Sequence, residues 1–169
     1  NAGKTANLRA ENLTLANPSG AVFSAGGATG NGTLTILADT LTLGLGDKAI
    51  EGYGEIAIEA TELKGEGAGE TRIDASVDLA LARLSGGAES DQRLASSGAL
   101  TVSHAVADRD LADVTELGAK WALEGAQVPL LGSFLQTAED RKNVGPERAL
   151  LCWGRYAQSQ PPPQLQPPS

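Results

Sequence analysis

Residues 34–43 read L-T-I-L-A-D-T-L-T-L, and this stretch decides the fold that the sequence predicts. Apolar residues occupy every second position on either side of a polar pair, Asp39 and Thr40: Leu34, Ile36 and Ala38 before it, and Leu41 and Leu43 after it. Alternation by two is typical of a β-strand with one buried face, whereas an amphipathic helix repeats every three or four residues. The polar pair in the middle predicts a corner at which the strand bends and continues.

Five further segments repeat this pattern along the chain. Each has apolar residues at its first, third and sixth positions and an apolar residue or glycine at its eighth. The copies start at intervals of 28, 22, 21, 21 and 21 residues, at Leu8, Ile36, Ile58, Leu79, Leu100 and Trp121. A second apolar row follows each start by 14 or 15 residues, at Val22, Ile50, Ile73, Leu94 and Val114. Such a period is the signature of repeat proteins, whose units bury their apolar faces only by stacking.

The repeats predict an all-β fold, a parallel β-helix of about six coils with about 21 residues per coil. An aromatic content of 4% beside 21 glycines suits a narrow interior of small aliphatic side chains and many tight turns. We expect Trp121 to close one interior ladder as a terminal plug, with a surface tryptophan as the alternative. The two expected ladders are Leu8, Ile36, Ile58, Leu79, Leu100, Trp121 and Leu13, Leu41, Leu63, Leu84, Ala105, Ala126.

The chain divides into three parts. Residues 1–132 form the predicted repeat domain, and residues 133–156 a short capping segment, irregular or helical, with Ser133 as a helix cap. Residues 157–169 are rich in Pro and Gln and predict an extended, disordered tail. We expect Phe134 and its following segment to cover the last coil, because an unpaired strand edge invites aggregation.

Charge and composition exclude several classes of function. A net charge of −8 without a basic run argues against nucleic-acid binding. No apolar run reaches the ~18 residues of a membrane span. The single cysteine, Cys152, cannot form an internal disulfide. Because the sequence starts at Asn1 and contains no Met, we expect a piece of a longer polypeptide, with any targeting signal outside it.

No catalytic constellation accompanies the repeats, and we predict no catalytic, cofactor-binding or metal-binding residues. His104 is the only histidine and occupies an outward position, as expected of a surface side chain. The acidic cluster Asp108, Asp110 and Asp113, with Arg109 inside it, is interpreted as a turn between coils. Acid–base catalysis and cation binding are the alternatives for this cluster, because enzymes on β-helices place carboxylates on an outer face.

Two other patterns are weak. Residues 44–47, G-L-G-D, faintly match a repeated calcium-binding motif, yet they occur only once. Outward threonines resemble an ice-binding array, but the matching positions in other copies are Glu, Lys, Arg and Ser. The four threonines are Thr33, Thr35, Thr40 and Thr42.

The copies L-R-A-E-N-L-T-L, I-L-A-D-T-L-T-L and I-E-A-T-E-L-K-G, with the later G-A-L-T-V-S-H, resemble the filamentous haemagglutinin-like exoproteins of two-partner secretion systems. The resemblance covers roughly residues 6–132. It implies a right-handed parallel β-helix, export through an outer-membrane secretion partner, and a secreted or cell-surface location. The N-P-N-G-type signals of that family's secretion domain are not visible here, and the Pro-rich tail resembles no toxin.

The leading hypothesis is a structural and adhesive segment of a secreted β-helical exoprotein, not an enzyme. Its partners would be glycans or proteins on host or neighbouring cells. The alternative is a carbohydrate-active enzyme, a polysaccharide lyase or hydrolase, on the same scaffold. That alternative requires carboxylates aligned on adjacent coils, and the sequence shows no such column.

Overall fold

The computed structural model describes residues 3–21, 30–87, 89–104, 119–128, 130–131, 140–143 and 148–152. Within these ranges the chain is all-β and contains no helix. None of the described segments therefore supplies a helix that is long and apolar enough to cross a membrane.

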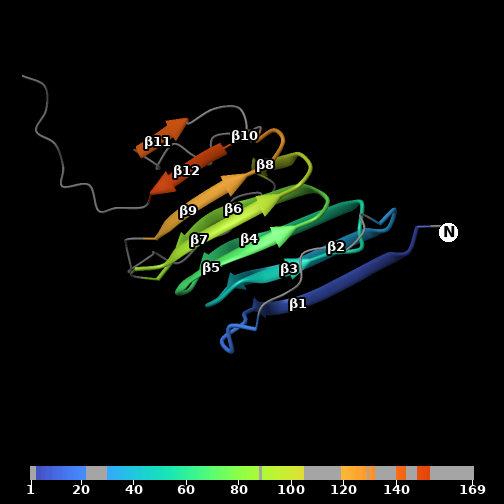
Figure 1. The fold of residues 1–169 in the computed structure, drawn as a ribbon, viewed down its shortest axis with the longest axis horizontal. Coiled ribbons are helices and arrows are strands. Elements are labelled where there is room, and N and C mark those ends of the chain that lie inside the picture. Colours follow the sequence, from blue (N-terminus) through green and yellow to red (C-terminus); the bar gives the residue numbers. More distant parts are fainter. Residues whose placement is uncertain are drawn as a thin grey trace, which may run out of the picture.

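The strands form two six-stranded sheets (Figure 1). Sheet A is entirely parallel and contains, in spatial order, β1 (Thr5–Leu15), β2 (Thr33–Leu43), β4 (Glu55–Gly65), β6 (Ser76–Gly86), β8 (Leu100–His104) and β10 (Leu130–Leu131). Sheet B contains β3 (Lys48–Ile50), β5 (Ala68–Ile73), β7 (Asp91–Ser96), β9 (Lys120–Glu124), β12 (Arg148–Cys152) and β11 (Asp140–Asn143).

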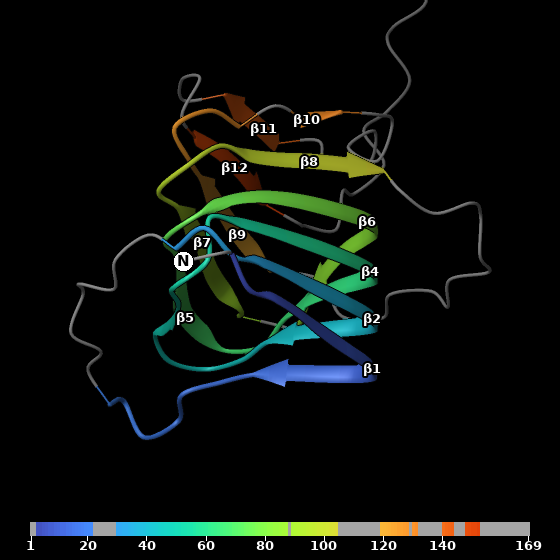
Figure 2. The ribbon, with the colours of Figure 1, turned by 90° about the vertical axis from the view of Figure 1, so that its right-hand side faces the viewer.

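Consecutive strands from β2 to β10 alternate between the two sheets, so the chain crosses from one sheet to the other after every strand. Figure 2 shows β1, β2, β4, β6 and β8 stacked one above another, with the strands of sheet B behind them. Strands β3, β5, β7 and β9 are also parallel. For the described residues, the prediction of an all-β fold with parallel strands in its sheets is therefore confirmed.

The interior ladders follow the predicted register through the first four copies. Leu8, Ile36, Ile58 and Leu79 are successive partners across sheet A. The second ladder likewise joins Leu13, Leu41, Leu63 and Leu84. The space left between the sheets, near Leu63, Ile73 and Leu94, measures only about 10 Å³, too little for a ligand.

The predicted register is wrong from the fifth copy onward. Leu79 pairs with Val102 rather than with Leu100, which instead pairs with Val77. The turn between β6 and β7 spans residues 87–90, whereas the equivalent turn between β4 and β5 spans only residues 66–67. This turn contains Glu89, whose φ of 63° marks a left-handed corner. The two extra residues move every later strand out of the 21-residue period.

The same shift affects the second apolar row. Ile50 pairs with Ile73 as predicted, but Leu94 pairs with Thr71. Val22 and Val114 lie outside the described residues.

Trp121 belongs to sheet B and not to the predicted ladder of sheet A. It pairs with Gln92 of β7 and is 1% exposed, so the surface alternative is also wrong. Its indole Nε1 donates a hydrogen bond to the carbonyl oxygen of Ser85 at 3.0 Å. Ala126 is exposed in a turn rather than buried in the second ladder, and Ala105 lies outside the described residues.

Part of the predicted capping segment, residues 133–156, forms two paired strands instead of a helix: β11 and β12. Strands β11 and β12 pair with each other in antiparallel fashion, and β12 adds antiparallel to β9. The helix readings for residues 140–143 and 148–152 are therefore wrong. Ser133, Phe134 and the tail 157–169 lie outside the described residues.

Candidate ligand-binding groove

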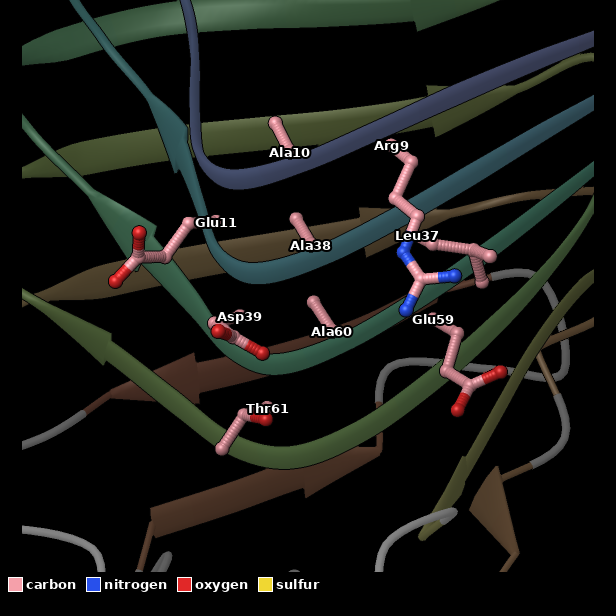
Figure 3. Close-up of a pocket in the computed structure, with 9 residues that line it drawn as sticks. All are labelled: Arg9, Ala10, Glu11, Leu37, Ala38, Asp39, Glu59, Ala60 and Thr61. Carbon is pink, nitrogen blue, oxygen red and sulfur yellow. The ribbon is translucent and has the colours of Figure 1, made fainter.

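The long strands of sheet A bend at the position of Asp39. The ladder between β1 and β2 passes from Ala10 and Ala38 directly to Asn12 and Thr40, and it skips Glu11 and Asp39. The next ladder skips Asp39 and Thr61 in the same way. Figure 3 shows the ribbons curving at these residues. The corner that the polar pair predicts is therefore present, and it recurs on neighbouring strands.

A groove of about 590 Å³ follows this bend across β1, β2 and β4. Its residues form three columns, each with one member from each strand (Figure 3). One flank carries Arg9, Leu37 and Glu59; Ala10, Ala38 and Ala60 lie between; the other flank carries Glu11, Asp39 and Thr61.

The groove offers both charged and apolar contacts at an exposed surface. Arg9, Glu11, Asp39 and Glu59 are exposed, and Leu37 is half-buried. Within the described part of the chain, Arg9, Glu11 and Glu59 form no ion pair. Their donors and acceptors are available to a bound molecule. Arg9 and Glu11 lie on β1, and Glu59 lies two strands away on β4, at about twice the ~4.8 Å spacing of paired strands.

A well-ordered ion pair borders the groove one residue beyond Thr61. Arg83 donates two hydrogen bonds to Glu62, Nε to Oε1 at 3.1 Å and Nη2 to Oε2 at 2.8 Å. The hydroxyl of Ser85 also donates to Oε1. Burial alone would raise the pKa of Glu62, but the hydrogen bonds from Arg83 and Ser85, helped by the charges of Arg83 and Lys64, lower it overall. The pair anchors β4 to β6 beside the bend.

Glu62→Gln should destabilise the fold at neutral pH by about 1–2 kcal/mol, because it removes a charge-assisted, bidentate pair. The folded-state pKa of Glu62 lies below its usual 4.5, so its stabilisation is complete above that value and is lost as pH falls through the lowered pKa. Urea unfolding of both proteins from neutral pH to about pH 3 measures this loss.

The control for this titration is Glu59→Gln, which removes an exposed carboxylate from the same strand. It should change the free energy of unfolding by less than about 0.5 kcal/mol at any pH. If the difference in the free energy of unfolding between wild type and Glu62→Gln stays constant down to acidic pH, the ionised carboxylate of Glu62 does not stabilise the fold as proposed.

Sheet B carries its own charge network. Arg93 bridges Glu70, at 2.6 Å from Nη1 to Oε2, and Glu124 on β9. The hydrogen bond that Arg93 donates to Glu124 outweighs partial burial and raises the pKa of Arg93. The Nη2 atom of Arg72 lies 3.4 Å from Oε1 of Glu70. These pairs join β5, β7 and β9 and act as structural contacts.

The G-L-G-D segment binds the side-chain ammonium group of the next residue, Lys48. The buried Lys48 donates from Nζ to the carbonyl oxygens of Gly44 and Gly46, both at 2.5 Å. Burial lowers the pKa of Lys48, and nearby Asp47 opposes that shift. One Asp47 carboxylate oxygen, Oδ1, accepts the amide of Glu70 at 3.0 Å. Two carbonyl oxygens of this segment and one carboxylate oxygen of Asp47 thus accept hydrogen bonds from the protein itself.

Of His104 and the acidic cluster singled out in the sequence, the structure describes only His104. Asp108, Arg109, Asp110 and Asp113 lie outside the described residues, while His104 is exposed at the end of β8. Within the described residues, no group of three or more His, Cys, Asp or Glu side chains could hold a metal ion.

Sequence reasoning missed the groove, although a signal for it existed. Glu11 and Asp39 occupy the same fourth position of the first two copies, and stacking of those copies places their carboxylates in one column. The column ends at Thr61 in the third copy, which is why the acidic character was not recognised as a repeat.

Comparison of this chain with protein-family models, with curated proteins and with solved structures finds no match.

Proposed function

We propose that the chain is a structural and adhesive segment of a secreted exoprotein, built as a right-handed parallel β-helix of about six coils. The observation that supports the scaffold is the alternation of consecutive strands from β2 to β10 between the two sheets, in which these strands pair in parallel. The observation that supports adhesion is the exposed groove at the bend. In it, β1, β2 and β4 each contribute one residue to each of three columns. Its ligands are glycans or proteins on host or neighbouring cells.

The mechanism is geometric. A stack of strands in register holds each groove residue at a fixed distance from its equivalent on the next strand. Arg9 and the carboxylates make polar contacts, and Leu37 adds an apolar contact. Each contact is weak, so useful attachment requires many copies of the protein on one surface. By its resemblance, the exoprotein reaches that surface through an outer-membrane secretion partner, and it requires no cofactor.

Replacing the groove side chains together, Arg9→Ala, Leu37→Ala and Glu59→Ala, should weaken attachment of protein-coated beads to target cells by about 10-fold or more. The expected loss follows from removing one flank of the groove while keeping the buried faces of β1, β2 and β4 intact. Bead retention on bacterial and epithelial cells and on an array of surface glycans measures the effect.

The control is Arg72→Ala, which removes an exposed cation from sheet B and leaves the groove unchanged. It should attach as wild type does. Equal retention of the triple variant and wild type would remove the groove from the proposal. Absence of any retention by wild-type beads would contradict adhesion itself.

The column formed by Glu11 and Asp39 favours a second candidate, a carbohydrate-active enzyme. Carboxylates on adjacent strands are ~4.8 Å apart at the backbone, close to the separation of the pair in retaining glycosidases. Against this, both residues are exposed, whereas a general acid in such enzymes is kept protonated by burial. Polysaccharide cleavage that is lost in the Glu11→Gln, Asp39→Asn variant would favour the enzyme.

A further inference from the structure

Strand β7 has two registers against β5 that keep its apolar side chains on the inner face. In the structure Leu94 pairs with Thr71. A slip of β7 by two residues would place Leu94 opposite Ile73, the register that the 21-residue period predicts. Such a slip preserves the inner face, because side chains alternate with a period of two. It would also shorten the turn between β6 and β7, residues 87–90, to the length of the turn at residues 66–67.

The hydrogen bonds of the interior amide Gln92 exist only in the observed register. Gln92 is 0% exposed and lies opposite Gly69 on β5. Its Nε2 atom donates to the carbonyl oxygens of Gly67 at 2.8 Å and of Glu66 at 3.1 Å, in the turn before β5. The slip would move Gln92 opposite Thr71, ~6.6 Å farther from that turn along the strand. A buried amide that loses its partners is unfavourable, so these hydrogen bonds oppose the slip.

Neighbouring strands of sheet B use interior donors in the same way. Trp121 pairs with Gln92 across the sheet, and its Nε1 donates to the carbonyl oxygen of Ser85 near the end of β6. At the start of β3, Lys48 donates to the carbonyl oxygen of Gly44. Each donor fixes the position of its strand relative to carbonyl groups at or just beyond the end of a sheet A strand.

Charges on the outer face oppose the same slip. Arg93 lies opposite Glu70, with Nη1 at 2.6 Å from Oε2. After the slip, Arg93 would lie opposite Arg72, and Asp91 opposite Glu70. Like charges directly opposite each other on paired strands are unfavourable. Because these side chains are partly exposed, their contribution is small, and the interior amide is the main determinant.

We propose that Gln92 selects the register of β7 and excludes the two-residue slip that the apolar pattern allows. This one buried amide thereby decides which outer side chains of β5 and β7 stand side by side. The inference is independent of the adhesive function, because it depends only on strand pairing within sheet B.

Disulfide cross-linking distinguishes the two registers in the full chain. All variants carry Cys152→Ser, which removes the only native cysteine. Arg72→Cys with Ala95→Cys reports the observed register, and Arg72→Cys with Arg93→Cys reports the slipped one. Directly opposite positions are ~4.8 Å apart, whereas an offset of two residues gives about 7–8 Å, too far for a disulfide. The second pair also removes both arginines, so only the interior then decides the register.

Gln92→Leu should raise the yield of the slipped-register disulfide by about 10-fold or more, because the hydrogen bonds that oppose the slip are gone. With Gln92 in place, only the observed-register pair should cross-link. The matched control is Thr71→Val, which removes another buried polar group, a hydroxyl without a hydrogen bond within the described residues. It should leave the slipped-register yield unchanged.

A second variant transfers the amide to the position that the slip would bring opposite Gly69. Ser90→Gln with Gln92→Leu restores a donor to the same turn in the slipped register. It should form the slipped-register disulfide and keep its sheet content by circular dichroism. If Gln92→Leu alone loses its sheet content, this double variant decides.

Three results would overturn the proposal. The first is a folded Gln92→Leu variant whose slipped-register yield does not rise. The second is an equal rise in Thr71→Val, since loss of any buried polar group would then release the slip. The third is a double variant that either keeps the observed register or loses its sheet content.

Discussion

Gly46→Ala should destabilise the protein by about 2–5 kcal/mol, one of the largest effects expected from a single added methyl group. Gly46 has a φ of +85°, which costs a residue with a side chain about 1–2 kcal/mol. In addition, a Cβ there would lie 2.2 Å from the carbonyl oxygen of Asn17, so the backbone must move. Gly46 also donates its amide to Ala68 and accepts from Lys48, so such a movement disturbs both neighbours.

Gly52→Ala separates the two causes. Its φ of +86° is nearly the same, but no atom lies within 4 Å of the position that a Cβ would take. We expect only the conformational cost, about 1–2 kcal/mol. Urea unfolding of the two variants measures the difference between their free energies of unfolding. That difference is the cost of the close contact between a Cβ at residue 46 and Asn17. Equal destabilisation would mean that this corner relaxes without cost.

Trp121→Ala should cost about 3–5 kcal/mol, because it removes the largest buried side chain of the interior. The indole lies against Gly65: a methyl group at that glycine would be 3.0 Å from the Trp121 Cζ2 atom. The backbone around the indole belongs to paired strands of both sheets and has little freedom to collapse into the space left. The loss of the hydrogen bond to Ser85 leaves a carbonyl without its partner.

Trp121→Phe is the matched control, since it keeps a ring in the space but has no donor for Ser85. We expect about 1–3 kcal/mol, from the lost hydrogen bond and the smaller ring. Chemical denaturation followed by circular dichroism compares the three proteins. A loss below about 1 kcal/mol for Trp121→Ala would show that the residue is not enclosed between the sheets.

The parallel sheet, the register of the first four copies and the bend at Asp39 were predictable from the sequence. In residues 5–86 the copies start 28, 22 and 21 residues apart, and the extra length of the first interval falls between β1 and β2, so apolar periodicity and strand register coincide. The register from Leu100 onward was not predictable in the same way. A turn can take two more residues at little free-energy cost, and alternation by two hides the shift because Leu100 and Val102 are both apolar.

The candidate groove shows the same division. In the sequence, the charged residues of the groove do not stand out as a group, because Arg9 and Glu59 belong to copies that start 50 residues apart. Stacking of β1, β2 and β4 brings them to one flank of one bend.

The sequence by itself determined the strand period, the position of the bend and the alternation of buried and exposed faces, because these are local consequences of side-chain spacing. Only the tertiary structure decided which copies pair in register, which sheet contains Trp121, and that β11 and β12 pair in antiparallel fashion. Those outcomes depend on turn lengths and on pairing between distant strands, and a local pattern carries neither.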